Sequence, residues 1–221
     1  MNLYVRVRLA LLLFGLGTLC FNIGEVVVGA VTWRAGVITI SECLLGIVFI
    51  FGPEFFKRLF KVGFPAMLVY YYWLFLWLSV FVGTCLNMMD MVPFWDKLLH
   101  VSSPMILTAV GYGICGLLLM NTGKTMEQFS PWLFLIFGFS FAGVSGVIWE
   151  FWEWTWDTFA HMNLQRYMAH GELLVGQRAL ADTMGDLLMN TLGAVIMGAV
   201  SWWYYRKDPS YFARFEIAIL R

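Results

Sequence analysis

Charged residues are scarce in this chain: only 13% of its 221 residues are Asp, Glu, Lys or Arg, whereas 61% are hydrophobic. A soluble domain carries about 25% charged residues, so this composition excludes an ordinary soluble protein. The chain has no basic stripe and a formal net charge of zero, which argues against nucleic acid as a partner. It carries instead long apolar runs, 11 Trp and 20 Phe, a composition typical of a polytopic membrane protein.

Cysteine is equally sparse, and each of the four cysteines stands alone in an apolar run: Cys20, Cys43, Cys85 and Cys115. The sequence has neither a CxxC pair nor a Cys/His cluster, so it shows no sign of a thiolate metal site or a redox dithiol. We interpret these cysteines as small buried residues.

Six apolar segments approach the length of about 20 residues that one spanning helix needs. They are residues 8–30, 36–52, 64–86, 95–120, 131–157 and 181–205. We predict an all-α fold, a transmembrane bundle of about six spans that forms a single integral membrane domain over 1–221. Within it, 1–86 supplies three N-terminal spans and 90–205 supplies three spans with the polar residues. The connection 158–180 is a polar outer loop, and 206–221 is a cytoplasmic tail whose stretch 211–220 is amphipathic enough to lie on the membrane surface.

The basic residues predict the orientation, because cytoplasmic loops are enriched in Lys and Arg. With the N-terminus inside, the inner side holds Arg6, Arg8, Lys57, Arg58, Lys61, Lys124, Arg206, Lys207, Arg214 and Arg221. The outer side holds Arg34, Lys97, Arg166 and Arg178. This asymmetry predicts that both termini are cytoplasmic.

The fifth predicted span ends in a tryptophan-rich stretch with three carboxylates, Gly146-Val-Ile-Trp-Glu-Phe-Trp-Glu-Trp-Thr-Trp-Asp157. Glu150, Glu153 and Asp157 are spaced by three and then four residues, which places them on one helix face. Tryptophans favour the membrane–water interface. Acids at this depth are costly unless a cation or a proton shares their field, so the stretch predicts a functional site.

Two further polar rows lie at the outer ends of neighbouring spans. Asp96 and His100 are four residues apart at the start of the fourth span, and Asp182, Asp186 and Asn190 form an i, i+4, i+8 row in the sixth. We expect the three helices to direct these groups into one outward-facing site. Carboxylates with a single histidine suit Mg²⁺, Mn²⁺, Ca²⁺ or, with fewer ligands, Zn²⁺.

Roles in such a metal site follow from residue type. The candidate metal ligands are His100, Glu150, Asp182 and Asp186. The candidate catalytic residues are Glu153 or Asp157 as general base and Arg178 as the partner of a substrate phosphate or carboxylate. Asp96 and Asn190 are further site candidates.

Structural interpretations stay open for the same residues. Asp96 and Asp182 are also acids that a helix dipole favours in a first turn, His100 also suits a hydrogen-bonded structural role, and the tryptophans also suit an interfacial belt. Shared protons, or ion pairs with Arg178 and Lys97, are alternatives to a metal ion.

The polar motifs resemble those of known membrane proteins. Asp96-Lys-Leu-Leu-His100, Glu150 and Asp186-Leu-Leu-Met-Asn190-Thr-Leu-Gly-Ala resemble the VanZ-like family of small polytopic bacterial membrane proteins. Trp95-Asp96 with His100, Glu150-Phe-Trp-Glu153-Trp and Asp182-x-x-x-Asp186 are similar to YjdF-like inner-membrane proteins. The chain departs from the first pattern at Glu153, where Gln is usual, and from the second at Asn190, where an apolar residue is usual. The resemblance implies a multi-pass protein of the bacterial plasma membrane with a role in envelope lipids, and it implies no particular reaction.

Three functions are compatible with these residues. The leading hypothesis is a divalent-metal-dependent enzyme that acts at the outer leaflet on a cell-envelope lipid or glycolipid. A second is a proton- or cation-coupled transporter or lipid translocase, which needs polar groups that continue inward from Asn190. The third is a non-catalytic envelope or antibiotic-resistance accessory protein whose ionic cluster holds the helices together. Membrane lipids are the expected partners, and the sequence does not indicate an oligomeric state.

Overall fold

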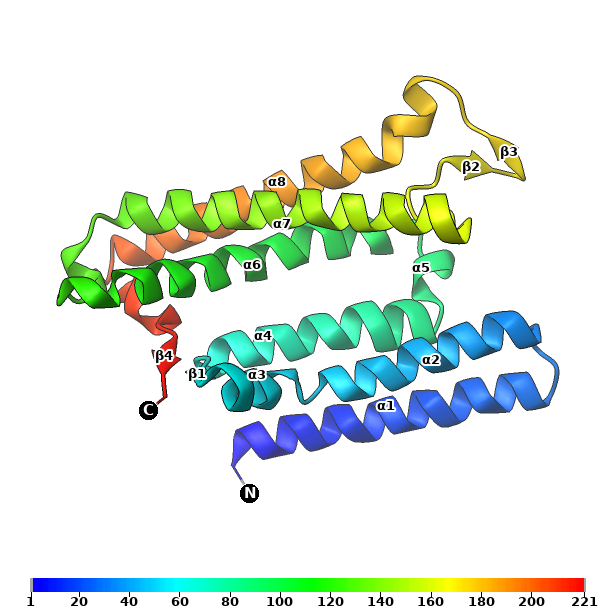
Figure 1. The fold of residues 1–221 in the computed structure, drawn as a ribbon, viewed down its shortest axis with the longest axis horizontal. Coiled ribbons are helices and arrows are strands. Elements are labelled where there is room, and N and C mark those ends of the chain that lie inside the picture. The colour runs from blue at the N-terminus through cyan, green and yellow to red at the C-terminus, as the bar shows by residue number, and fades with distance from the viewer. Residues whose placement is uncertain (1, 221) are drawn as a thin grey trace. The chain divides into compact units, whose positions relative to one another are not determined.

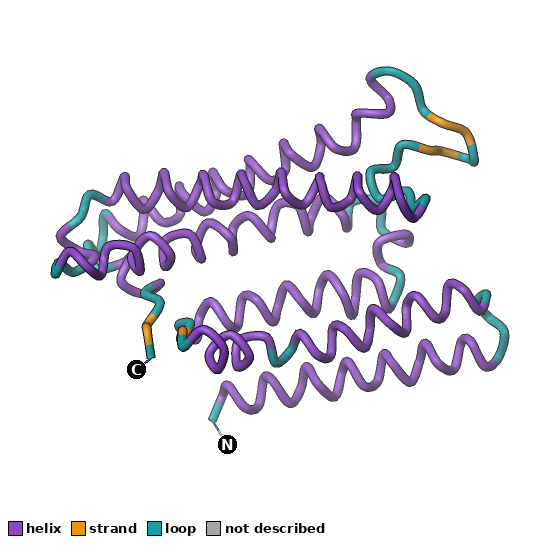
Figure 2. The backbone as a smooth tube through the Cα atoms, viewed as in Figure 1, coloured by secondary structure: helices purple, strands orange, loops and turns teal. Residues whose placement is uncertain are grey.

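The computed structural model describes residues 2–220, which form helices joined by short connections (Figures 1 and 2). Arg221, assigned above to the cytoplasmic side, lies outside the described residues. The long helical segments are α1 (Leu3–Val27), α2 (Trp33–Phe49), α4 (Ala66–Leu76) continued by the π-helix η1 (Trp77–Cys85), α6 (Trp95–Leu119), α7 (Pro131–Ala160) and α8 (Gln177–Tyr205). The short helical segments are α3 (Gly52–Phe60), α5 (Met88–Met91), η2 (Met120–Thr122), η3 (Met126–Gln128) and η4 (Tyr211–Phe215). The strands are β1 (Val62–Gly63), β2 (Met168–Ala169), β3 (Glu172–Leu173) and β4 (Ala218–Ile219).

The number of membrane-length helices agrees with the predicted bundle. Within the described residues, five segments are long and apolar enough to cross a bilayer: α1, α4 with η1, α6, α7 and α8. A sixth span results if α2 and α3 are counted together, although they are bent by 54° at the break between them. The all-α prediction of about six spans is therefore confirmed.

Local sequence signals explain where these helices begin and end. The side chain of Asn2 accepts a hydrogen bond from the backbone N–H of Val5 and caps α1, and Thr32 caps α2 in the same way. Such side chains satisfy N–H groups that have no partner within the helix. Helix α7 begins at Pro131, whose missing N–H is harmless in a first turn. It ends before His161, which takes the left-handed conformation with φ of 51°.

The chain divides into two compact units, residues 1–99 with 217–221 and residues 100–216. The division falls within the continuous helix α6. The first unit contains α1 to α5, and its core is apolar: Leu11, Cys43, Ile50, Val69, Trp73, Leu76, Phe81 and Cys85. Buried polar groups in this core are hydrogen-bonded, as burial requires. The amide of Asn22 donates to the backbone oxygens of Thr18 and Cys85 at 2.8 and 3.0 Å.

The second unit packs α6, α7 and α8 closely, because glycines stand where the helices approach. A Cβ atom added to Gly193 of α8 would lie 2.1 Å from the carbonyl oxygen of Val101 in α6. One added to Gly146 of α7 would lie 2.5 Å from the side-chain nitrogen of Asn190 in α8. Small residues permit such contacts between membrane helices. These two glycines therefore set how near α8 comes to the polar ends of α6 and α7.

The C-terminal segment contributes aromatic side chains to the core of the second unit. In η4, Phe212 and Phe215 are buried, with 3% and 0% of their surface exposed. Their rings lie edge-on to Tyr112 of α6, with centroids 5.1 and 5.4 Å apart. The rings of Phe212 and Phe215 are thus packed in an aromatic cluster of the second unit. A position of this stretch at the membrane surface stays a prediction.

Candidate functional site

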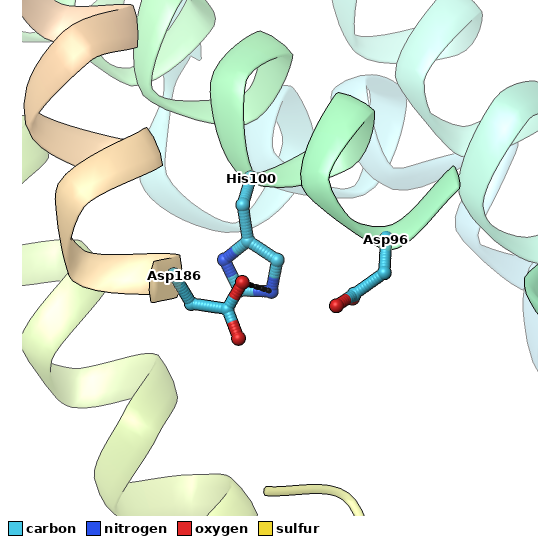
Figure 3. Close-up of side chains that lie close together, drawn as sticks. All are labelled: Asp96, His100 and Asp186. Carbon is cyan, nitrogen blue, oxygen red and sulfur yellow. Dashed lines mark ion pairs between the residues drawn. The ribbon is translucent and has the colours of Figure 1, made fainter. Parts of the chain in front are cut away.

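His100 and Asp186 form the centre of a buried polar cluster. His100 comes from α6 and Asp186 from α8, and His100 Nε2 lies 3.7 Å from Asp186 Oδ1 (Figure 3). Only 8% of the His100 surface and 1% of the Asp186 surface is exposed. The predicted approach of His100 to Asp186 is therefore present in the structure.

Asp96 joins this pair because it precedes His100 by one turn of the same helix. Figure 3 shows its carboxylate on the side of α6 that carries the imidazole. Each of the three residues offers one ligand atom, and these atoms all lie within 4.8 Å of one another. All three side chains are buried. Two carboxylates and an imidazole at this separation are a donor set that can hold a metal ion.

The carboxylates of α7 line the same side of their helix. Glu150, Glu153 and Asp157 are all buried. The neighbouring tryptophans point away from the protein interior and are between 43% and 56% exposed: Trp149, Trp152, Trp154 and Trp156. Helical spacing explains this separation, because acids three and four residues apart share a face while the intervening aromatics cover the others. The acids therefore face protein, and the tryptophans lie on the exposed faces of the helix.

Glu150 is the α7 acid most closely associated with the central pair. It interacts electrostatically with both Asp186 and His100. Its Oε2 accepts a hydrogen bond of 3.4 Å from the side-chain amide of Gln165, which also donates to Thr183 Oγ1 at 3.0 Å. Its Oε1 is buried and has no hydrogen-bond partner within the described residues. One oxygen of Glu150 is thus available to a ligand or water.

The other two α7 acids have structural contacts. Asp157 accepts hydrogen bonds from the backbone N–H groups of Leu164 and Gln165, at 2.7 and 2.9 Å. It therefore anchors the loop that follows α7. Glu153 accepts a hydrogen bond of 2.9 Å from the indole nitrogen of Trp149, one turn earlier. Glu153 and Asp157 thus share a helix face with Glu150, but each accepts hydrogen bonds from a partner of its own.

Asp182 and Arg178 are not brought into the central group. The Asp182 carboxylate lies 3.9 Å from the guanidinium of Arg166, which comes from the loop after α7. Arg178 is exposed at the start of α8, and within residues 2–220 it takes part in no side-chain hydrogen bond or ion pair. Asn190 is buried one turn deeper than Asp186 and contacts Gly146. The three clustered ligand atoms belong to Asp96, His100 and Asp186. Asp182 and Glu150, which were predicted as metal ligands, are not in this group, and Asp96 is.

Two residues of the site were missed by sequence reasoning. Gln165 lies in the irregular loop, where no periodicity predicts which side chain turns toward the helices. A short hairpin stiffens that loop, with Met168 opposite Leu173 and Ala169 opposite Glu172. Thr183 precedes Asp186 by three residues, so the helical spacing that selected Asp186 also points to it. Its hydroxyl did not stand out because threonine is common in membrane helices.

The fold and these residues define a multi-pass membrane protein with a buried carboxylate–histidine cluster. The chain belongs to the family described as "Predicted membrane protein (DUF2238)", whose model matches residues 11–207. It is similar to an "Uncharacterized protein" of Thermotoga maritima, with 30% identity over 132 residues. That alignment covers 59% of this chain and 58% of the relative. No solved structure matches the chain significantly.

Proposed function

We propose that Asp96, His100 and Asp186 bind a divalent metal ion and that the protein uses it in an enzymatic reaction on a cell-envelope lipid or glycolipid. The observation that supports this proposal is the burial of all three groups with ligand atoms within 4.8 Å. Two buried carboxylates carry a large desolvation cost unless opposite charge accompanies them. Lys97 lies 3.4 Å from the Asp96 carboxylate and offsets part of this cost. A divalent cation held between the two carboxylates would neutralise both.

The separation of the ligand atoms bears on which metal fits. Oxygen ligands lie at about 2.3–2.6 Å from Ca²⁺, so atoms on opposite sides of that ion are up to roughly 5 Å apart. Ligands of Mg²⁺ lie at about 2.0–2.1 Å, which brings opposite atoms to roughly 4.2 Å. The observed limit of 4.8 Å suits the larger ion directly. Mg²⁺, Mn²⁺ or Zn²⁺ requires the side chains to close by a few tenths of an ångström.

Glu150 is the best-placed general base in this proposal. Its buried Oε1 lacks a hydrogen-bond partner within residues 2–220, and the carboxylate is close enough to the central pair to interact with it. It can accept a proton from a water molecule or a substrate hydroxyl. Asp157 is less suited to the role of general base than the sequence suggested, since both its oxygens accept hydrogen bonds from backbone N–H groups of the loop. The exposed Arg178 remains a candidate for contact with a substrate phosphate.

The membrane placement of the site supports a lipid substrate. The tryptophans around the acids suit the headgroup level of a bilayer. The distribution of Lys and Arg favours cytoplasmic termini, an orientation in which this level belongs to the outer leaflet. The likeness of the polar motifs to VanZ-like and YjdF-like proteins favours the bacterial plasma membrane. The substrate proposed is accordingly an envelope lipid or glycolipid of the outer leaflet.

Metal binding by the purified full-length protein tests the first half of the proposal. After incubation with Ca²⁺, Mg²⁺, Mn²⁺ or Zn²⁺ and removal of excess ion, elemental analysis should find about one ion per chain for at least one metal. Asp186→Asn should bind none, whereas Glu172→Gln, which removes an exposed acid of β3, should bind as the wild type does. Equal binding by both variants, or no binding by the wild type, contradicts the proposal. Metal-dependent conversion of an extracted envelope lipid, absent in Asp186→Asn, tests the second half.

A second function, proton- or cation-coupled transport, is favoured by a separate observation. Polar groups continue beyond the cluster along the second unit, where Thr108, Tyr112 and Ser201 are all fully buried. Asn190 stands between Asp186 and Ser201 along α8, and its side-chain nitrogen has no hydrogen-bond partner within residues 2–220. Transport needs polar groups that continue inward from Asn190, and these buried hydroxyls supply such groups.

Ion flux into proteoliposomes separates transport from catalysis. If the buried hydroxyls form part of a path, Thr108→Val and Ser201→Ala should each lower the flux while leaving metal binding intact. Thr155→Ala is a suitable control, because that hydroxyl is exposed and bonds only to the backbone of its own helix. An absence of flux in the wild type removes the transport function and leaves the enzymatic one.

A further inference from the structure

Helix α3, in the first unit, is strongly amphipathic. Its positions 54, 57, 58 and 61 follow an i, i+3, i+4, i+7 pattern and carry one acid and three cations. The opposite face is aromatic and aliphatic, with four side chains between 47% and 60% exposed: Phe55, Phe56, Leu59 and Phe60. A helix of this kind suits a membrane interface, with its apolar face in the lipid and its charges toward water.

The chain direction around α3 fits that location. The helix begins after a bend of 54° from the axis of α2, so it does not continue straight across the membrane. It contains Pro53 in its first turn and stops at Lys61, which has a left-handed backbone with φ of 54°. Strand β1 then pairs with β4, and the backbone N–H of Leu220 donates to the carbonyl oxygen of Lys61 at 2.7 Å. The C-terminal strand therefore fixes Leu220 beside the cations of α3.

A cavity of about 400 Å³ opens at this point, lined by Glu54, Lys57, Arg58, Lys61 and Leu220. Its single acid has other partners. One oxygen of Glu54 accepts hydrogen bonds from the guanidinium of Arg8 and, at 2.9 Å, from the hydroxyl of Tyr4. No ion pair within the described residues involves Lys57, Arg58 or Lys61. The cavity thus carries an excess of positive charge.

We propose that this cavity binds the phosphodiester headgroup of an anionic bilayer phospholipid. Lys57, Arg58 and Lys61 supply charge-assisted donors to the phosphate, and the exposed aromatic face of α3 lies against the acyl chains. The combination of cations and adjacent apolar surface distinguishes a lipid from free phosphate. With cytoplasmic termini, α3 lies at the inner leaflet, where anionic lipids attract basic segments. This inference does not depend on the metal-dependent reaction.

Lipid titration of the full-length protein in detergent tests the proposal. Native mass spectrometry should show binding of phosphatidylglycerol, and this lipid should raise the melting temperature more than phosphatidylcholine with the same acyl chains. The double variant Lys57→Gln/Arg58→Gln should bind phosphatidylglycerol roughly 20–30-fold more weakly, because each cation near an anionic headgroup contributes a factor of about five. Lys57→Arg, which keeps the charge, should bind nearly as well as the wild type.

A control variant with the same change in net charge separates binding at this site from general electrostatic attraction between the protein and anionic lipid. Arg34→Gln/Lys124→Gln also removes two exposed cations, from other parts of the chain, and should leave phosphatidylglycerol binding unchanged. Equal weakening in both double variants, or equal binding of the two lipids, overturns the proposal. Stabilisation by inorganic phosphate as strong as that by phosphatidylglycerol overturns the lipid as ligand. A melting transition of each variant in phosphatidylcholine alone shows whether that variant is folded. If the double variant is misfolded, the comparison of the two lipids on the wild-type protein decides whether the proposal holds.

Discussion

His100 Nε2 and Asp186 Oδ1 lie 3.7 Å apart, although the two residues are 86 positions apart in the chain and belong to different helices. Both side chains are buried, and Asp96 stands one turn before His100. This arrangement is the main physical reason to expect a bound cation. It also makes the surrounding residues testable one at a time, since their contacts assign them different roles.

Glu150→Gln should separate chemistry from metal binding. The amide keeps the size of the side chain but cannot act as a general base, so turnover of the lipid substrate should fall by about 10²–10⁴-fold. Binding of the metal ion should persist, because Asp96, His100 and Asp186 are unchanged. Elemental analysis and a product assay on the same preparation measure both. Loss of the metal together with activity would instead make Glu150 a ligand, as the sequence first suggested.

Gly193→Ala should destabilise the second unit. The new Cβ atom would stand 2.1 Å from the backbone oxygen of Val101, which cannot rotate away. Overpacking of this kind costs about 1–3 kcal/mol, and it should also weaken metal binding by moving α8 away from α6. Gly198→Ala is the matched control, since nothing lies within 4 Å of its added Cβ atom. Unfolding in mixed detergents compares the two, and equal stabilities would contradict the close contact.

Asp157→Ala should release the loop after α7. The substitution removes the carboxylate that accepts hydrogen bonds from the backbone N–H groups of Leu164 and Gln165. A hydrogen bond to a charged group contributes about 1.5–3 kcal/mol, so opening of the loop should become at least roughly tenfold more frequent. Hydrogen exchange at these two amides and tryptic cleavage after Arg166 report it. Thr158→Ala, beside it on the exposed surface, should change neither rate.

Asp208, after the end of α8, should give a local dependence on pH. The side chain of Ser210, then Arg214 and the Ser210 backbone N–H, donate hydrogen bonds that hold the pKa of Asp208 below its ordinary value of 3.8. A lowered folded pKa means that the ionised carboxylate stabilises the turn above the ordinary value. That stabilisation is lost as the pH falls below 3.8 and through the folded pKa.

Hydrogen exchange of the Ser210 amide, followed from pH 5 down to pH 2.5, measures this loss. The amide donates to Asp208 Oδ1 at 3.0 Å, so its protection should fall as the carboxylate gains a proton. Asp208→Asn should show low protection at pH 5 and little further change. Protection that stays constant over this range in the wild type would contradict the assigned contact.

Much of the fold was predictable because it depends on local chemistry. The apolar runs predicted the membrane helices to within a few residues, and only the second span differs in form. There Gly52 and Pro53 allow a break between α2 and α3, which a count of apolar residues does not register. The burial of Phe212 and Phe215 was also not predicted, because an amphipathic pattern does not distinguish a lipid surface from an aromatic cluster in the protein.

The sequence by itself determined which residues share a face of each helix. Spacings of three and four residues place Glu150, Glu153 and Asp157 together, and likewise Asp96 and His100, wherever their helices lie. The tertiary structure alone decided which of these rows of polar side chains come into contact. Close contact at Gly193 brings Asp186 to His100, while Asp182, one turn away, faces Arg166 of the loop instead. The physical reason is that helix periodicity is a local property, whereas the height and rotation of one helix against another depend on packing between residues far apart in the chain.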